Sequence, residues 1–331
     1  MDIDLQSIKR ILIIQYQPFG DVLLNTGYFP ALRKKFPDAK IDYLVKQKYR
    51  IVLDKNPYLD ELVTFKEGKG WRYVPERIKL IMRIRERNYD LIIDQIRGFG
   101  SAQMAWFSGA KFRLGFKHKK YAFLYNLKAE RQSVRYHSSM KFDALLPLGI
   151  TEEPHKLYFN IEPESEEYID NWLKQSGFDE ERIIIFSPGS PVARKKWNLN
   201  AYARLGEMIL QNLNCKIVIL WAPNEKEDAD ALFELMNQKP LMAPATDLNQ
   251  AAAMLKRSAL LICNDGGLNH LSVATETPSI AIFGSIKPYR WSPEMFEGHY
   301  HFFNEQHDSL KDDSFGIDPD KVYQKVLEIL E

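Results

Sequence analysis

Short apolar runs alternate with helix-like patterns along this chain. Four consecutive apolar residues, Ile11–Ile14, predict a buried strand. A turn through Pro18 and Gly20 follows, and apolar residues then recur at helical spacing before the next strand-like run, "KIDYLV". Strand, loop, helix and strand form a βαβ unit, which indicates a parallel sheet. The segments "DELVTF", "YDLIIDQIRG" and "AKFRLGF" continue this alternation, with "RIKLIMRIRER" as an amphipathic helix between two of them.

The second half of the chain opens in the same way as the first. An apolar run and a Pro-Gly turn, "RIIIFSPGS", precede a helical segment, "NLNAYARLGEMILQNL". Three more strands are predicted at "CKIVILWAP", "ALLICND" and "PSIAIFGS", with a helix at "DLNQAAAMLKRS". A linker at Ile161–Pro163 separates the halves, so we expect domains at residues 1–163 and 164–331. The predicted fold is α/β, with two Rossmann-like, doubly wound domains whose ligand-binding loops follow the strands and face an interdomain cleft.

The composition is that of a globular protein. The 331 residues fit two domains of ordinary size, with 45% hydrophobic and 27% charged residues. No apolar run reaches the roughly 18–20 residues of a membrane span, and the N-terminus does not have the pattern of a signal peptide. Cys215 and Cys263 lie in apolar runs without metal-ligand spacing, which favours buried, reduced thiols and a cytoplasmic location.

The formal net charge of +1 hides an asymmetry. Residues 1–165 contain 29 Lys+Arg and 19 Asp+Glu, a net of +10, whereas the remainder contains 16 and 25, a net of −9. Between Lys111 and Lys141 there are nine basic residues and one acidic residue, Glu130. This pattern indicates an anionic partner for the first half, although basic residues that only solvate helices would produce it too.

Polar residues follow the first strand of each half. Asp21 lies where a helix should start, and it is either the N-cap of that helix or a general base in the cleft. In the second half, "SPGSPVARKKWNL" combines hydroxyls, a glycine and cations, which is the mixture that a phosphate or diphosphate requires. An exposed basic loop is the alternative explanation for that segment.

A third polar segment, Asp265-Gly266-Gly267, follows the strand "ALLICN". Two glycines allow the backbone to approach a ligand closely, and the following helix, which carries His270, presents N–H groups that favour an anion. A structural histidine is the simpler explanation for His270 alone. Together with the Lys195 loop, the segment favours a phosphate site.

Other chemistries lack their motifs. The chain has no G-x-G-x-x-G, no P-loop motif and no G-x-S-x-G elbow. It has no metal-binding motif, and its aromatic residues do not alternate with basic ones as in nucleic-acid-binding surfaces. We therefore expect no metal, no cofactor and no nucleic-acid partner.

Four segments between Ile11 and Pro293 resemble a known family in the right order. They are "ILIIQYQPFGDVLLNTGYFPALRKKFPDAKIDYLV", "SGAKFRLGF", "KKWNLNAYARL" and "LLICNDGGLNHLSVATETPSIAIFGSIKPYRWSP". The chain thereby resembles the ADP-heptose:lipopolysaccharide heptosyltransferases, glycosyltransferase family nine. The resemblance implies the GT-B architecture, with the nucleotide sugar held mainly by the second domain, and inversion of the anomeric centre without a metal.

The resemblance also implies roles for individual residues. Asp21 matches the catalytic aspartate, which takes the proton of the acceptor hydroxyl. The matching donor-binding positions are Ser190 and Lys195 at the phosphates, Glu225 at the ribose, and Asp265, Gly266, Gly267 and His270 around the diphosphate. On the acceptor side the expected residues are Gly20, Arg97 and Arg113.

The sequence departs from the family pattern at three places. Gly266 replaces the usual threonine, and Lys287 in "FGSIKP" stands where an acid is usual. The run "QIRGFGSA" replaces a Gln-Gly element, so Arg97 takes the place of the family's cation there. These changes lie near the expected sugar and acceptor sides.

Together these features predict an inverting, metal-independent transferase that moves heptose from ADP-heptose onto a lipopolysaccharide core acceptor. Its expected partners are the nucleotide sugar, an anionic glycolipid and the cytoplasmic face of the inner membrane, which it contacts peripherally. The alternatives are a relative that uses another nucleotide sugar or a capsule or protein acceptor, a nucleotide-sugar epimerase of the same fold, and a non-catalytic nucleotide-sugar-binding protein.

Overall fold

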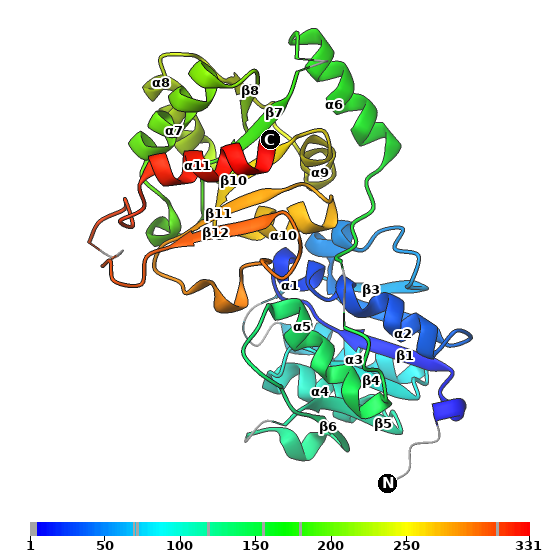
Figure 1. The fold of residues 1–331 in the computed structure, drawn as a ribbon. Helices are drawn as coiled ribbons and strands as arrows, with labels where there is room; N and C mark the ends of the chain where they lie inside the picture. The colour runs from blue at the N-terminus through cyan, green and yellow to red at the C-terminus, as the bar shows by residue number, and fades with distance from the viewer. Residues whose placement is uncertain are drawn as a thin grey trace. The chain divides into compact units, whose positions relative to one another are not determined.

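Two parallel sheets organise the chain, one in each of two units, Met1–Asn160 and Ile161–Glu331 (Figure 1). The computed structural model describes residues 5–68, 70, 73–117, 120–153, 156–178, 181–308 and 311–331. The division into units falls three residues before the predicted boundary.

The first unit is built on a six-stranded sheet with the order β3-β2-β1-β4-β5-β6, in which all neighbouring strands are parallel. Its strands are β1 (Arg10–Ile14), β2 (Lys40–Lys46), β3 (Glu61–Phe65), β4 (Leu91–Asp94), β5 (Phe112–Phe116) and β6 (Leu127–Ala129). Its helices are α1 (Phe19–Leu23), α2 (Phe29–Lys35), α3 (Val74–Glu86), α4 (Phe99–Phe107) and α5 (His137–Phe142), with short 3₁₀ helices such as η5 (Ala122–Leu124). The central strands β1 and β4 are fully buried apart from Arg10, because helices cover both faces of a parallel sheet.

The second unit repeats this topology. The sheet order is β12-β11-β10-β7-β8-β9, again parallel throughout. Its strands are β7 (Ile183–Ser187), β8 (Lys216–Ile219), β9 (Leu241–Met242), β10 (Leu260–Asn264), β11 (Ser279–Phe283) and β12 (His299–Phe303). Its helices are α6 (Pro163–Gln175), α7 (Leu199–Asn212), α8 (Lys226–Leu235), α9 (Leu248–Lys256), α10 (Gly267–Ala274) and α11 (Pro319–Leu330). Counted from the first strand of each unit, both sheets have the order 3-2-1-4-5-6 of doubly wound folds.

A buried tryptophan anchors the core of the second unit. Trp197 is 1% exposed, packs edge-to-face on Tyr202 with ring centroids 5.0 Å apart, and donates its indole N–H to the carbonyl of Ser314. Because aromatic side chains bury large apolar areas, this contact fixes the loop between β7 and α7 against the sheet. That loop carries several of the predicted site residues.

The predicted strands are confirmed wherever the apolar run is long. Every segment predicted as a strand contains one, whereas β6, β9 and β12 were not predicted. The strands β6 and β9 have only three and two residues, and β12, "HYHFF", mixes histidines with aromatic residues at a sheet edge. Such segments carry little hydrophobic periodicity, so only pairing with a neighbouring strand makes them recognisable. In the part of the chain that the structure describes, no helix has both the length and the apolar content that crossing a bilayer requires.

Candidate functional site

Each unit gathers polar residues at the carboxyl ends of two neighbouring strands. In the first unit these strands are β1 and β4, and in the second they are β7 and β10. In doubly wound sheets this pair marks the point where the strand order reverses, and the crevice there is the usual ligand site.

Asp21 lies in the first turn of α1, which follows β1. The helix begins at Phe19 and Pro18 occupies the N-cap position, so the alternative that Asp21 is the N-cap is wrong. A carboxylate in the first turn is favoured by the positive end of the helix dipole. Asp21 is therefore a first-turn residue and not the cap of its helix.

The carboxylate of Asp21 forms an ion pair with a buried lysine. The Nζ atom of Lys141, on α5, lies 3.0 Å from Oδ1 of Asp21, and the two side chains are 2% and 20% exposed. Burial lowers the pKa of Lys141, while the nearby Asp21 carboxylate raises it. The nearby guanidinium groups of Arg131 and Arg97 lower the pKa of Lys141 further. Asp21 thus partly offsets a concentration of positive charge at this end of the sheet.

Arg97, which was predicted for the acceptor side, is one of these cations. It follows β4 with a φ of 66°, and its guanidinium lies over the Phe116 ring, 5.8 Å from the centroid. Arg131 covers the same ring at 5.2 Å. The Nε atom of Arg97 is buried and has no hydrogen-bond partner among the described residues. A non-glycine residue in the left-handed region indicates local strain, which is common at functional sites.

Arg113 and Gly20 contribute differently from Arg97. Arg113 donates from Nε to the carbonyl of Leu124 and from Nη1 to that of Ala110, at 3.1 and 2.8 Å, and it stacks over Trp106. No contact of the described residues joins Arg113 to the Asp21 pair, so we leave it out of the proposed site. Gly20 directly precedes Asp21 in α1, where its carbonyl accepts the N–H of Leu24.

The second unit holds a lysine–aspartate pair at the ends of β7 and β10. Lys195, in the loop after β7, places Nζ 2.6 Å from Oδ2 of Asp265, and the side chains are 24% and 4% exposed. The contact is an ion pair without hydrogen-bond alignment, since Oδ2 has no hydrogen-bond partner in the described part of the chain. A buried carboxylate thereby holds a partly exposed ammonium, which an anionic ligand could also contact.

Asn264 connects the two loops. Its amide donates to the carbonyl of Pro188 at 2.6 Å, and its side-chain oxygen accepts the backbone N–H of Trp197 at 3.0 Å. These bonds fix the segment between Pro188 and Trp197, which includes Ser190 and Lys195, to the end of β10. The spacing between Lys195 and Asp265 therefore depends on the Asn264 side chain.

Ser190 and Glu225 lie beside the same loop. A Cβ added at Gly189 would come within 2.5 Å of Cβ of Glu225, so the glycine allows the two segments to touch. Burial raises the pKa of Glu225, and Asp228 raises it further. Ser190 is 6% exposed and accepts the N–H of Val192 at 3.3 Å. Glu225 can therefore offer a partly desolvated carboxyl group to hydroxyls of a ligand.

The glycine pair begins α10. Gly266 is the N-cap residue with extended backbone, φ −173°, and Gly267 is the first helical residue. His270, also on α10, is 4% exposed and lies near Trp291, with ring centroids 6.2 Å apart. Gly266 has no side chain that could cap this helix, and N–H groups at the start of a helix favour an anion.

Comparison with known proteins identifies the family. The model of glycosyltransferase family 9 (heptosyltransferase) matches residues 77–307, which is more than half of the chain. The chain belongs to this family.

Individual relatives agree with this membership. The chain is 24% identical over 292 residues to lipopolysaccharide heptosyltransferase 2 of Escherichia coli K12, covering 84% of each sequence. Two solved structures share the fold. A family 9 glycosyltransferase of Veillonella parvula matches with a TM-score of 0.87 and 24% identity over 97% of both chains. E. coli heptosyltransferase WaaC with ADP-2-deoxy-2-fluoro heptose matches with a TM-score of 0.74 and 18% identity over 96% of this chain and 99% of that one. The predicted GT-B fold and glycosyltransferase activity are thus confirmed.

Two departures from the family pattern have clear structural surroundings. A Cβ at Gly266 would have its nearest neighbour, the carbonyl oxygen of Asn264, at 3.7 Å, so nothing requires glycine there. Lys287 is paired with Glu305 and is more than half exposed.

In the described part of the chain, no group of three or more His, Cys, Asp or Glu side chains is placed to hold a metal ion.

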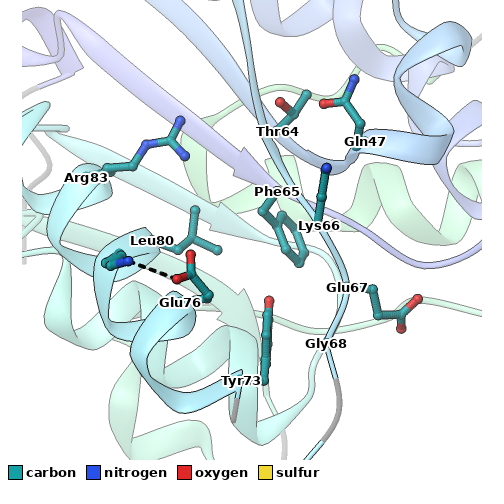
Figure 2. Close-up of a pocket in the computed structure, with 11 residues that line it drawn as sticks. Gln47, Thr64, Phe65, Lys66, Glu67, Gly68, Tyr73, Glu76, Leu80 and Arg83 are labelled. Carbon is teal, nitrogen blue, oxygen red and sulfur yellow. Dashed lines mark hydrogen bonds and ion pairs between the residues drawn. The ribbon is translucent and has the colours of Figure 1, made fainter.

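A cavity of about 690 Å³ opens in the first unit beside α3 and the end of β3 (Figure 2). Its charged lining includes Lys66, Lys79 and Arg83, as well as Glu67 and Glu76. Both carboxylates are paired with lysines, Glu67 with Lys46 and Lys48, and Glu76 with Lys79. Lys66 and Arg83 have no ion pair with any described residue, so the cavity has cationic side chains available to an anion.

Sequence reasoning missed the roles of Lys141 and Asn264, and it missed this cavity. Lys141 was counted only as part of a basic segment, yet it lies between Met140 and Phe142 in a helix whose residues from Ser138 on are buried. A single lysine among apolar and small residues is the signal that could have identified it. Asn264 is the last residue of a buried strand, and its amide has both a donor and an acceptor, so it can form hydrogen bonds to two segments at the same time. The cavity had no comparable signal.

We expect Asp21→Asn to destabilise the protein in a pH-dependent way. The change leaves the buried Lys141 ammonium without its carboxylate, so the free energy of unfolding at pH 7 should fall by about 2–4 kcal/mol. Because the folded-state pKa of Lys141 lies below its ordinary value, the unfolded state binds more protons between the two values. Stability should therefore recover as the pH rises toward 10.5. Urea denaturation between pH 6 and 10 measures this effect.

The control for this prediction is the double variant Asp21→Asn, Lys141→Met, which removes the unpaired ammonium and should restore most of the stability at pH 7. A loss that does not change with pH, or a double variant as unstable as the single one, would contradict the charge pair.

Gly266→Thr should be tolerated, whereas Gly189→Ala should not. At Gly266 the backbone is extended and the surroundings are open, so the free energy of unfolding should change by no more than about 0.5 kcal/mol. At Gly189 the new methyl group overlaps Glu225, and we expect a loss of about 1–3 kcal/mol. Chemical denaturation of both variants provides the measurement. If Gly266→Thr lowered the free energy of unfolding as much as Gly189→Ala, the open space around Gly266 would be contradicted.

Proposed function

We propose that this family member is an inverting, metal-independent transferase that moves heptose from ADP-heptose onto a lipopolysaccharide core acceptor. The observation that carries the proposal is the state of Asp21, the position that matches the catalytic aspartate of the family. It is a partly exposed carboxylate, not a helix cap, and a buried lysine holds it at the end of β1.

In this mechanism Asp21 acts as the general base. The oxygen of an acceptor hydroxyl attacks the anomeric carbon, the hydroxyl proton passes to Asp21, and the bond between the anomeric carbon and the diphosphate oxygen breaks, which releases ADP. Lys141 contacts Oδ1 of Asp21 and leaves Oδ2 for the proton. The ammonium orients the carboxylate.

Lys195 and the start of α10 stabilise the leaving group in this proposal. The lysine offers a charge-assisted contact to the diphosphate, and the uncapped N–H groups of α10 offer further donors. Ser190, Asp265, Gly266, Gly267 and His270 complete the phosphate end. Glu225 binds the ribose hydroxyls. The relative crystallised with ADP-2-deoxy-2-fluoro heptose supports ADP-heptose as the donor.

The acceptor in this proposal is an anionic glycolipid. Arg97 beside the Asp21 pair and the cavity with Lys66 and Arg83 supply cations in the unit whose sequence is basic. The relatives named as lipopolysaccharide heptosyltransferases support the core oligosaccharide as this acceptor. Such an enzyme works in the cytoplasm at the inner face of the membrane, where the acceptor is displayed.

A family relative with another donor or acceptor is the second candidate. Gly266 in place of threonine removes a hydroxyl from the phosphate end, and Lys287 changes the charge in a segment where the family has an acid. The same departures would suit a protein that binds a nucleotide sugar without turning it over.

A nucleotide panel tests the donor. We expect ADP to raise the melting temperature more than UDP, GDP or CMP do, and EDTA to leave that shift unchanged. Transfer of heptose from ADP-heptose to a purified core acceptor, followed by mass spectrometry, tests the reaction itself. A preference for UDP, or loss of the shift in EDTA, would contradict the proposal.

Two substitutions separate the proposed roles. Asp21→Asn should lower kcat by about 10²–10⁴-fold with little change in the Kd for ADP, because the base acts only on the acceptor proton. Lys195→Gln should lower kcat/KM by about 30- to 1,000-fold and weaken ADP binding, corresponding to about 2–4 kcal/mol in the barrier. The matched controls Asp38→Asn and Lys239→Gln, at exposed positions, should behave like wild type. Equal donor binding without turnover in both wild type and Asp21→Asn would indicate a binding protein.

A further inference from the structure

One outer face of the first unit carries exposed, large apolar side chains. On α3, Val74, Ile78 and Met82 are 52%, 55% and 49% exposed. Their spacing of four residues places them in one line along the helix. The neighbouring α4 and η5 add aromatic side chains that are about half exposed or more. We call the whole set the α3–α4 apolar face: Val74, Ile78, Met82, Phe99, Trp106, Phe107 and Phe123.

Contacts join the elements that carry the α3–α4 apolar face. Arg77 on α3 donates from Nη2 to the carbonyl of Gly100 at 3.0 Å, and Arg85 donates from Nη1 to that of Phe107 at 3.2 Å. These bonds hold α3 along α4. On the other side of α4, Phe99 packs on Tyr121, next to η5, with ring centroids 5.2 Å apart. The three elements therefore present their exposed side chains as one surface.

The surroundings of this surface are strongly basic. Between Val74 and Lys128 the sequence contains 12 Lys+Arg and 4 Asp+Glu, a net of +8. Among these residues Asp94 is fully buried and Glu76 neutralises Lys79, while acids outside the range pair with Arg87 and Lys117. Arg113 lies 5.0 Å from the Trp106 ring centroid, and Lys120 lies 5.6 Å from that of Tyr121. Two cations thus lie over aromatic rings at or beside the face.

This combination points to one class of partner. Exposed apolar patches bordered by polar residues are typical of interaction sites. Aromatic and aliphatic side chains flanked by Lys and Arg suit the boundary between lipid headgroups and acyl chains, where the apolar groups insert and the cations contact anionic headgroups. A second copy of the chain would bring two basic surfaces together, which charge repulsion disfavours.

We propose that the α3–α4 apolar face binds the surface of an anionic lipid bilayer. The choice of a bilayer rests on the proposed function, since a glycolipid acceptor is displayed on one. α4 begins at Phe99, two residues after Arg97, so the face extends to the end of the sheet that carries Asp21. Bound in this way, the first unit would have its acceptor-side residues close to the headgroups.

Vesicle co-sedimentation of the full chain tests the inference. We expect wild type to bind vesicles of phosphatidylcholine with 30% phosphatidylglycerol and not vesicles of phosphatidylcholine alone. The double variant Ile78→Ser, Phe123→Ser should bind the anionic vesicles at least about tenfold more weakly, because two inserting side chains are lost. High salt should weaken binding by wild type. The control pair Tyr168→Ser, Leu235→Ser removes apolar side chains of α6 and α8 that are 42% and 44% exposed, and it should bind like wild type.

Several results would overturn the inference. They are an absence of wild-type binding to anionic vesicles, equal loss in the control pair, and a dimer in sedimentation velocity that Ile78→Ser, Phe123→Ser abolishes. The last result would assign the face to contacts between copies. Transfer to a water-soluble acceptor fragment should be unchanged in the double variant. If no transfer is found while vesicle binding depends on the face, the proposed function fails and the docking surface stands.

Discussion

A parallel, doubly wound sheet opens a crevice where two adjacent central strands send their following helices to opposite faces. This constraint acts twice in the chain, once between β1 and β4 and once between β7 and β10. Asp21 and Arg97 follow the first pair of strands, and Ser190, Lys195 and Asp265 follow the second. The strand order of each unit therefore determines where its candidate site residues lie.

Each unit has an ion pair at the ends of its central strands, and the pair determines which charge is accessible there. Lys141 is almost completely buried, and removing an ammonium from water is costly unless a counter-charge is close. Asp21 supplies that charge, and the same contact orients the carboxylate. In the second unit the roles are reversed, since the buried member is Asp265 and the more exposed member is Lys195. One pair therefore presents a carboxylate and the other an ammonium, which suits a base in the first case and an anion site in the second.

The two faces of helices α3 and α4 in the first unit have different roles. Helices α3 and α4 use their inner faces for the core, where Leu80, Ile84 and Ala102 are buried. Their outer faces keep large apolar side chains among cations, although exposure of these side chains contributes nothing to folding. Exposed apolar patches with a polar border are typical of interaction sites, which agrees with the bilayer contact proposed for this face.

Much of the fold could be predicted from the sequence because its strands are buried on both faces. Continuous apolar runs such as Ile11–Ile14 identify central strands without tertiary information. Glycine, proline and polar residues directly after these runs locate the loops, and so Asp21, Lys195 and Asp265 were recognised as candidates. The edge strands β6, β9 and β12 could not be predicted in this way, because their pattern of hydrophobic and polar residues cannot be distinguished from that of a loop.

What only the tertiary structure decided is which of these residues meet. The partner of Asp21 is 120 positions away in sequence, and the clamp of the Lys195 loop is the side chain of Asn264. The position of Asp21 within α1 also depended on where the helix begins, which Pro18 sets. Periodicity reports the burial of a residue within its own segment, whereas contacts between distant segments arise from packing of the whole unit. For that reason the residue types of the site follow from the sequence, and its pairings follow from the fold.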